Sequence, residues 1–176
     1  IKELVSENDA IVHLAAQSGE TTSIDDPLYD MEINVQGTLN LLEACRLGLR
    51  NHKFVMASSN AVLGRQDPPA REDKAPLPVS PYGASKLAAE SYCMAYFGTW
   101  SIPTIVLRFG NVYGPYSSHK STVVSKFLQS AFRNESVTID GDGMQTRDYI
   151  YVGDLCDAIY KSLTTEVSGE VFQIAT

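Results

Sequence analysis

The residues best suited to acid–base chemistry are Tyr82 and Lys86, which follow Pro81 in the sequence. The proline and the Ala, Leu and Glu residues after it predict a helix that begins near Tyr82. Residues four apart lie on one face of a helix, so the phenol and the ammonium should be neighbours. A nearby ammonium lowers the pKa of a phenol, so this pair could take a proton from a hydroxyl group and return it. The same spacing also occurs on ordinary solvated helix faces.

Two more motifs accompany this pair: Ser58-Ser59 at the end of an apolar run, and the sequence LRFGNVYGP at residues 107–115. Together with Tyr-x-x-x-Lys they resemble the extended short-chain dehydrogenase/reductase family, and most closely its NAD-dependent nucleotide-sugar epimerases and dehydratases. The resemblance covers nearly the whole chain. It implies an α/β fold with a doubly wound, Rossmann-like and mostly parallel sheet.

Composition excludes some classes of function. The 176 residues carry a net charge of −7, which argues against nucleic acid as a partner. The sequence has no apolar run long enough to predict a membrane span. The cysteines and histidines lack metal-like spacing, so we expect no metal site. We expect all three thiols to be buried in a reducing, cytoplasmic compartment: Cys45, Cys93 and Cys156.

The resemblance divides the chain into two parts. Residues 1–115 would be the C-terminal part of an NAD-binding Rossmann domain, and residues 116–176 would contribute to a nucleotide-sugar-binding region and return to the sheet. Short strands are expected at 137–139 and 170–176. The G-x-x-G-x-x-G turn that cradles a dinucleotide is absent from these residues. We therefore expect it upstream of residue 1, expect residues 1–176 alone to bind NAD weakly without turnover, and leave NAD against NADP undecided.

A cofactor surface is expected where the apolar strand 10–14 ends in small residues, because ligands bind at the carboxyl ends of parallel strands. The alternative is that these small residues only let the chain turn tightly as it leaves the strand. The resemblance implies NAD contacts from these residues: Leu14, Ala15, Ala16, Gln17, Asn34, Ala57, Ser58, Tyr82, Lys86 and Phe109.

Ser59 takes the place of the family's catalytic Ser or Thr, where its hydroxyl would bridge the phenolate and a substrate hydroxyl. The alternative is that both serines only cap a turn. Arg147 is expected on the substrate diphosphate, because guanidinium matches phosphate oxygens; an Arg–Asp pair is its alternative. The resemblance implies a substrate site from these residues: Ser23 in a loop, Ser59, Asn60, Tyr82, Asn111 and Arg147.

The residues after Ser59 favour one reaction within the family. The 4,6-dehydratases place Asp-Glu there, whereas this chain has Asn60 and Ala61. The resemblance therefore implies NAD-dependent epimerisation at carbon 4 of a UDP-hexose through a 4-keto sugar, with Tyr82 as base and Ser59 and Lys86 assisting. A dehydratase, reductase or decarboxylase on the same scaffold is the alternative, and so is a non-catalytic dinucleotide-binding scaffold.

Apolar residues recur at helical spacing through residues 27–49. Gly37 inside this helix would cost about 1 kcal/mol against Ala, so we expect close packing there. Asn34 is expected to be a buried group that braces the active-site strands. Relatives pair through this helix and the one at 82–98, so the resemblance implies a homodimer.

Overall fold

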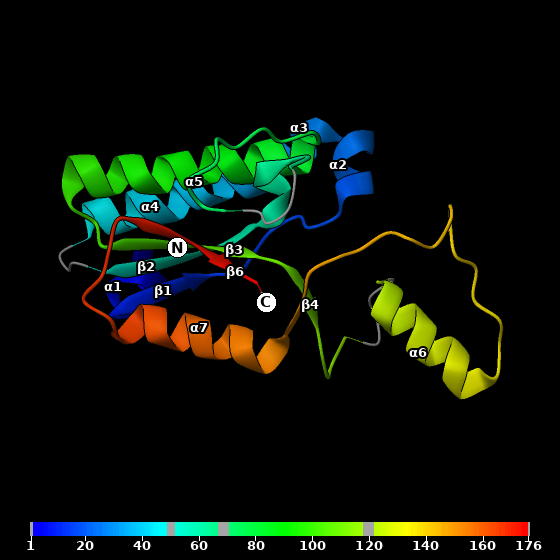
Figure 1. The fold of residues 1–176 in the computed structure, drawn as a ribbon. Helices are drawn as coiled ribbons and strands as arrows, with labels where there is room; N and C mark the ends of the chain where they lie inside the picture. Colours follow the sequence, from blue (N-terminus) through cyan, green and yellow to red (C-terminus); the bar gives the residue numbers. More distant parts are fainter. Residues whose placement is uncertain (1, 49–51, 67–70, 118–121, 176) are drawn as a thin grey trace.

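A four-stranded parallel sheet forms the centre of the chain in a computed structural model that describes residues 2–48, 52–66, 71–117 and 122–175 (Figure 1). The strand order is β1-β2-β3-β6, and every neighbouring pair is parallel. The strands are β1 (Ala10–His13), β2 (Lys53–Ser59), β3 (Thr104–Phe109) and β6 (Glu170–Ile174). Ser59 pairs with Phe109, and Phe109 with Ile174, so three strands end at one edge.

One face of the sheet is covered by the long helix α5 (Pro81–Trp100) and by a helical segment in three parts. That segment consists of α3 (Pro27–Met31), a π-helical turn (Glu32–Gln36) and α4 (Gly37–Leu47). The single helix predicted over 27–49 is therefore interrupted by a π turn; residue 49 lies outside the described residues. Buried side chains such as Leu42, Phe54 and Cys93 join these helices to the sheet.

The opposite face is covered by α7 (Val152–Thr164), whose Ile159 and Leu163 pack against Val55, Ile105 and Leu107 of the sheet. Strands buried on both faces have continuous apolar sequences, as predicted. The doubly wound α/β fold is confirmed. A short first helix, α1 (Lys2–Ser6), adds Val5 to the core on the α4–α5 side.

Between β3 and α7 the chain leaves the sheet and returns to it. Strands β4 (Asn111–Tyr113) and β5 (Tyr149–Tyr151) form a separate parallel pair. They flank α6 (Val123–Arg133), which lies apart from the main sheet in Figure 1. The strand predicted at 137–139 was wrong: this segment is irregular and exposed, and it pairs with none of the strands that the structure describes. The strand predicted at the C-terminal end is confirmed as β6.

Two packing predictions were also wrong. A Cβ built on Gly37 would meet nothing within 4 Å, so the structure offers no packing reason for this glycine. Cys45 and Cys93 are buried as predicted, whereas Cys156 is exposed on α7.

Among the described residues, none of the helices is long and apolar enough to cross a bilayer. No three His, Cys, Asp or Glu side chains of these residues are grouped so that they could hold a metal ion.

Candidate active site

Ser59 and Tyr82 meet where β2 ends and α5 begins. The Ser59 hydroxyl lies close enough to the Tyr82 phenol to lower the pKa of that phenol. The same hydroxyl accepts from the amide of Ala61 at 3.2 Å, and this bond caps the 3₁₀ turn Asn60–Leu63. The turn cap predicted as the alternative is therefore confirmed for Ser59, whereas Ser58 bonds to Glu90 instead. The contact of the Ser59 hydroxyl with a substrate stays a prediction.

The close approach of the two elements depends on Gly83. A Cβ at this position would lie 2.5 Å from the carbonyl oxygen of Ala61 and 3.0 Å from the Cβ of Pro78. Real Cβ atoms do not come so close to backbone oxygen, so only glycine permits this separation. Gly83 therefore lets the first turn of α5 lie directly against the turn that follows Ser59.

Two serines satisfy the free amides in the first turn of α5. Ser80 accepts from the amide of Gly83 at 3.1 Å, which is the usual cap. Ser23 accepts from the amide of Tyr82 at 3.1 Å and donates to the carbonyl of Glu20 at 2.7 Å. The loop predicted around Ser23 was wrong, because this residue lies in α2 (Glu20–Asp25) and is fully buried.

Lys86 is buried one turn beyond Tyr82, and its ammonium donates to the carbonyl of Ala57 on β2 at 3.0 Å. Burial lowers the pKa of Lys86 to about 8, and the negative charge of Asp30 opposes this change most. Tyr82 and Lys86 thus lie one turn apart on α5, as the spacing predicted, and the end of β2 holds the Lys86 side chain.

The pKa of Tyr82 differs from the prediction. Burial raises this pKa above its ordinary value, and the hydrogen bond from Ser59 opposes the rise only in part. The charges of Asp30 and Glu20 raise it further. The lowering predicted from Lys86 is wrong for these residues alone, because the pKa of Tyr82 is raised and loss of water around the phenol is the largest cause.

A buried hydrogen-bond network lies behind the two helices. The Asn34 side chain accepts from the amide of Gln17 at 2.9 Å and lies within 3.1 Å of the Gln17 carbonyl, Asp30 and Ser85. Ser85 in turn donates to the carbonyl of Tyr82 at 3.0 Å. The bracing role predicted for Asn34 is confirmed. Its side chain is 1% exposed and fully occupied by protein groups.

The residues predicted to contact NAD differ in whether their side chains are exposed to a ligand or already buried against protein groups. Leu14 and Ala15 are exposed immediately after β1, and Ala16 and Gln17 are half-buried. The Ser58 hydroxyl is buried and bonded to Glu90, Ala57 offers its carbonyl to Lys86, and Phe109 packs against the core beside Leu107. Of this group, the residues after β1 have side chains open to a ligand.

The sequence interpretation missed a buried ion pair that joins three elements. Arg108 on β3 donates to both oxygens of Glu90 on α5, at 2.7 Å for the Nη2 contact, and both side chains are about 5% exposed or less. Ser58 on β2 donates to the same carboxylate. Glu90 lies four residues after Lys86, so the spacing of Tyr82, Lys86 and Glu90 was the available signal.

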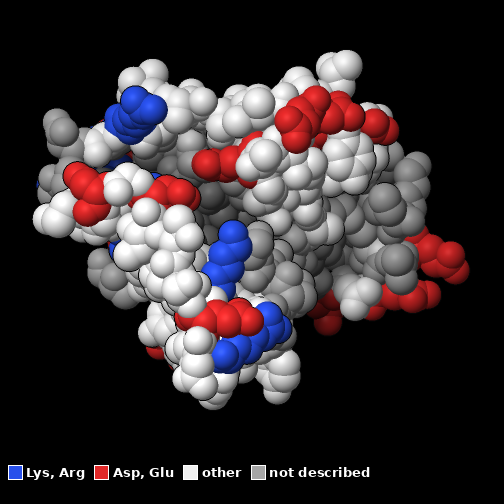
Figure 2. Space-filling view, turned by 90° about the vertical axis from the view of Figure 1, so that its right-hand side faces the viewer, with Lys and Arg blue, Asp and Glu red and all other residues white. Residues whose placement is uncertain are grey.

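A second group of predicted residues lies beyond β3. Asn111 and Arg147 line one hollow of about 420 Å³ together with Thr122 and Tyr149. Asn111 donates to the carbonyl of Asp148 at 2.9 Å, and the exposed Arg147 donates to the carbonyl of Thr146 at 2.8 Å. The side that carries the strand ends and α6 bears both signs of charge: acidic side chains form a row at the upper right of the view, and basic and acidic side chains are mixed over the rest of it (Figure 2).

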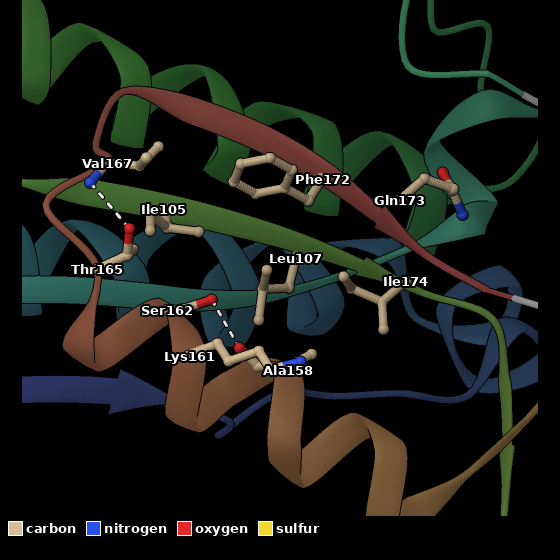
Figure 3. Close-up of a pocket in the computed structure, with 10 residues that line it drawn as sticks. All are labelled: Ile105, Leu107, Ala158, Lys161, Ser162, Thr165, Val167, Phe172, Gln173 and Ile174. Atoms are coloured by element: carbon tan, nitrogen blue, oxygen red, sulfur yellow. Dashed lines mark hydrogen bonds between the residues drawn. The ribbon is translucent and has the colours of Figure 1, made fainter.

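Another hollow, of about 310 Å³, lies between α7 and strands β3 and β6 (Figure 3). Ile105, Leu107, Phe172 and Ile174 give it apolar walls. None of Ser59, Tyr82 and Lys86 lines it. It is therefore separate from the candidate active site. Gln173 links the two regions, because its side chain contacts Asn60, next to Ser59.

Known proteins share this arrangement over almost the whole chain. Residues 1–175 match the NAD dependent epimerase/dehydratase family. A UDP-glucose 4-epimerase of Mycolicibacterium smegmatis is 36% identical over 96% of this chain and 55% of its own length. A UDP-N-acetyl-alpha-D-glucosaminuronate decarboxylase of Bacillus cytotoxicus is 31% identical over 99% of this chain and 56% of its own length.

The fold also matches a crystal structure of UDP-glucuronic acid 4-epimerase from Bacillus cereus in complex with UDP-glucuronic acid and NAD. The TM-score is 0.90 at 34% identity, over 99% of this chain and 56% of that one. The chain spans about half the length of the curated relatives it matches. Sequence match, fold and the Ser59–Tyr82–Lys86 geometry agree, and the chain belongs to the NAD dependent epimerase/dehydratase family.

Proposed function

We propose that this protein is an NAD-dependent epimerase that inverts carbon 4 of a UDP-activated hexose through a 4-keto sugar. The observation that carries the proposal is the meeting of the Ser59 hydroxyl and the Tyr82 phenol, with Lys86 fixed one helical turn away by its bond to Ala57. This group lies at the carboxyl end of a parallel sheet, where α/β folds bind their ligands. The UDP-sugar 4-epimerases among the matched proteins support the same reaction.

The residues after β1 suit an NAD site. Leu14 and Ala15 present exposed apolar surface that a flat nicotinamide ring could cover. The Lys86 ammonium has more donors than its one bond to Ala57 uses, and these would suit ribose hydroxyls. Bound NAD would supply the oxidant that takes the hydrogen of carbon 4 and gives it back.

Tyr82 would act as the base toward the sugar 4-hydroxyl. Its phenol needs a positive charge close by, because burial holds the pKa above the ordinary value. An oxidised nicotinamide ring carries such a charge, and Lys86 contributes to the extent that it stays protonated. Ser59 would donate a hydrogen bond to the sugar oxygen as that proton leaves.

The diphosphate of the substrate would bind near Arg147 and Asn111. They line the same hollow, and Arg147 is exposed there. Guanidinium groups pair with phosphate oxygens through two hydrogen bonds. Asn60 would lie beside the sugar because it follows Ser59 directly. The buried Ser23 hydroxyl would affect the substrate only through the position of Tyr82.

A homodimer in the cytoplasm completes the proposal. Large apolar side chains are exposed on the helical layer formed by α3, the π turn, α4 and α5: Leu28, Tyr29, Met31, Ile33, Leu47, Tyr92 and Trp100. Burial of such a patch against a second copy would be favourable. Sedimentation velocity would show a dimer, and a monomer at all concentrations would exclude it.

Product analysis tests the reaction. The full-length protein, supplied with NAD, is incubated with UDP-glucose, UDP-N-acetylglucosamine, UDP-glucuronate and TDP-glucose, and products are identified by proton NMR. We expect the 4-epimer of one UDP-sugar, and strongly reduced formation by the S59A control. A 4-keto-6-deoxy sugar, a reduced sugar or a released pentose with CO₂ would instead assign a dehydratase, a reductase or a decarboxylase. No product from any sugar would favour the non-catalytic scaffold.

A further inference from the structure

Asp30 is a buried carboxylate that the proposed reaction does not use. It lies on α3 and is 0% exposed. One oxygen accepts from the side-chain nitrogen of Asn34 at 3.1 Å. The other oxygen is buried without a hydrogen-bond partner among the described residues. Burying a carboxylate oxygen in this way is unfavourable unless a positive charge compensates.

The positive charge on which Asp30 acts is the ammonium of Lys86. Among the groups that raise the pKa of Lys86, Asp30 has the largest effect, ahead of Cys93 and Glu90 on α5. The same carboxylate raises the pKa of Tyr82. Within the described part of the chain, Asp30 is the one charged group that raises the pKa of both Tyr82 and Lys86, so it acts on the two residues together.

The remaining charged neighbours act on one member only. Glu20, on α2, raises the pKa of Tyr82 and is exposed. His13, at the end of β1, is held neutral at pH 7, because burial and the charge of Lys86 lower its pKa to about 4. His13 therefore adds no positive charge near Lys86 at neutral pH, and Asp30 remains the group that raises the pKa of Lys86 most.

Asp30 is also connected mechanically to the helix that carries the pair. Its partner Asn34 lies 3.0 Å from the Ser85 hydroxyl, and Ser85 donates to the carbonyl of Tyr82. We propose that Asp30 is a positioning residue of this site: its carboxylate supplies the counter-charge that keeps Lys86 a cation, and through Asn34 it steadies the first turn of α5.

Titration of the two side chains tests the electrostatic part without any assay of activity. Lys86 is followed by carbon-13 NMR of labelled lysines, assigned with K86M, and Tyr82 by ultraviolet absorbance, assigned with Y82F. In D30N the pKa of Lys86 should fall from about 8 by about one unit or more, and that of Tyr82 should fall too. The charged fraction of Lys86 at pH 7.5 would then drop from about three quarters to about one quarter.

The matched control is E20Q, which removes an exposed charge that acts on Tyr82. It should lower the pKa of Tyr82 and leave that of Lys86 unchanged. An unchanged Lys86 titration in D30N would overturn the proposal. If D30N does not fold, D30S is titrated in its place; failure of both to fold would also contradict the proposal, because Asp30 would then serve the fold alone.

The catalytic consequence rests on the proposed function. In D30N the alkaline limb of the kcat profile should move to lower pH by the same amount as the Lys86 titration, with KM nearly unchanged. A wild-type protein that turns over no sugar would refute the proposed function, while the two titrations would still decide the role of Asp30. Normal turnover with an unshifted profile would refute the role of Asp30 alone.

Discussion

The backbone amide of Tyr82 donates to the hydroxyl of Ser23, 59 residues earlier, at 3.1 Å. This bond ties the residue that would act as base to α2 rather than to its own loop. The capping residue Ser80 accepts from the neighbouring amide, that of Gly83. The start of α5 is therefore held by one local and one distant hydroxyl.

Replacement of Ser23 tests that distant bond. S23A leaves the amide of Tyr82 buried without an acceptor, so we expect a loss of about 1–2 kcal/mol in the free energy of unfolding. Urea unfolding measures it, with S80A as the control that removes the local cap. Turnover should fall more in S23A than in S80A if both retain their fold. Equal turnover in the two variants would show that Ser23 does not position Tyr82.

Gly83 and Gly98 offer a matched pair on one helix. A methyl group at Gly83 would meet the Ala61 carbonyl at 2.5 Å, whereas nothing lies within 4 Å of a methyl group at Gly98. G83A should therefore destabilise by about 1–3 kcal/mol through overpacking, and G98A should stabilise by about 0.5–1 kcal/mol. Thermal unfolding of both variants checks the signs. A stable G83A with full turnover would refute the close approach of α5 to the serine turn.

These contacts show what the sequence could and could not predict. Continuous apolar runs and the Tyr82–Lys86 spacing predicted the strands and the helix, because each signal is local. The place of Ser59 near this pair was predicted from the family resemblance. The bond from Ser23 was missed because it depends on how α2 packs. The strand expected at 137–139 failed for the same reason, since a β-branched run forms a strand only beside a partner.

The direction in which the pKa of Tyr82 shifts could also not be predicted from the sequence. Helical spacing predicts which charge lies near the phenol, but burial decides how strongly water is excluded. In the structure burial is the largest cause of the shift for both Tyr82 and Lys86. A buried polar partner such as Asp30 is recognised only when the helices are placed against the sheet.

His13 should make the protein sensitive to mild acid. Burial and the charge of Lys86 lower its pKa from 6.5 to about 4 in the folded state. The unfolded chain therefore takes up a proton between these values that the folded chain does not, and stability falls as the pH falls. At pH 5 this loss is about 2 kcal/mol.

Urea unfolding at pH 7 and pH 5 measures the effect of His13. Wild type should lose more stability than H13Q between these two values, because glutamine does not titrate. The comparison of the two proteins cancels the contribution of the carboxylates. An identical pH dependence in both proteins would show that His13 is not the group responsible.

Arg147 should affect substrate binding more than turnover. Loss of a guanidinium that bonds to a charged oxygen weakens binding by about 1.5–3 kcal/mol, or roughly 10- to 150-fold. We expect R147A to raise KM for the UDP-sugar by that factor with kcat nearly unchanged. R133A, an exposed arginine on α6, is the control. A KM in R147A equal to that of R133A would place the diphosphate elsewhere.

The measurement closest to the central claim compares Y82F with Y92F in the full-length protein. Both tyrosines lie on α5, but Tyr82 contacts Ser59 whereas Tyr92 is 41% exposed. With NAD and the preferred UDP-sugar, kcat for epimerisation should fall by about 10²–10⁴-fold in Y82F and remain near wild type in Y92F. Epimerisation by Y82F at the rate of Y92F would contradict the account, because the proton would then have another acceptor.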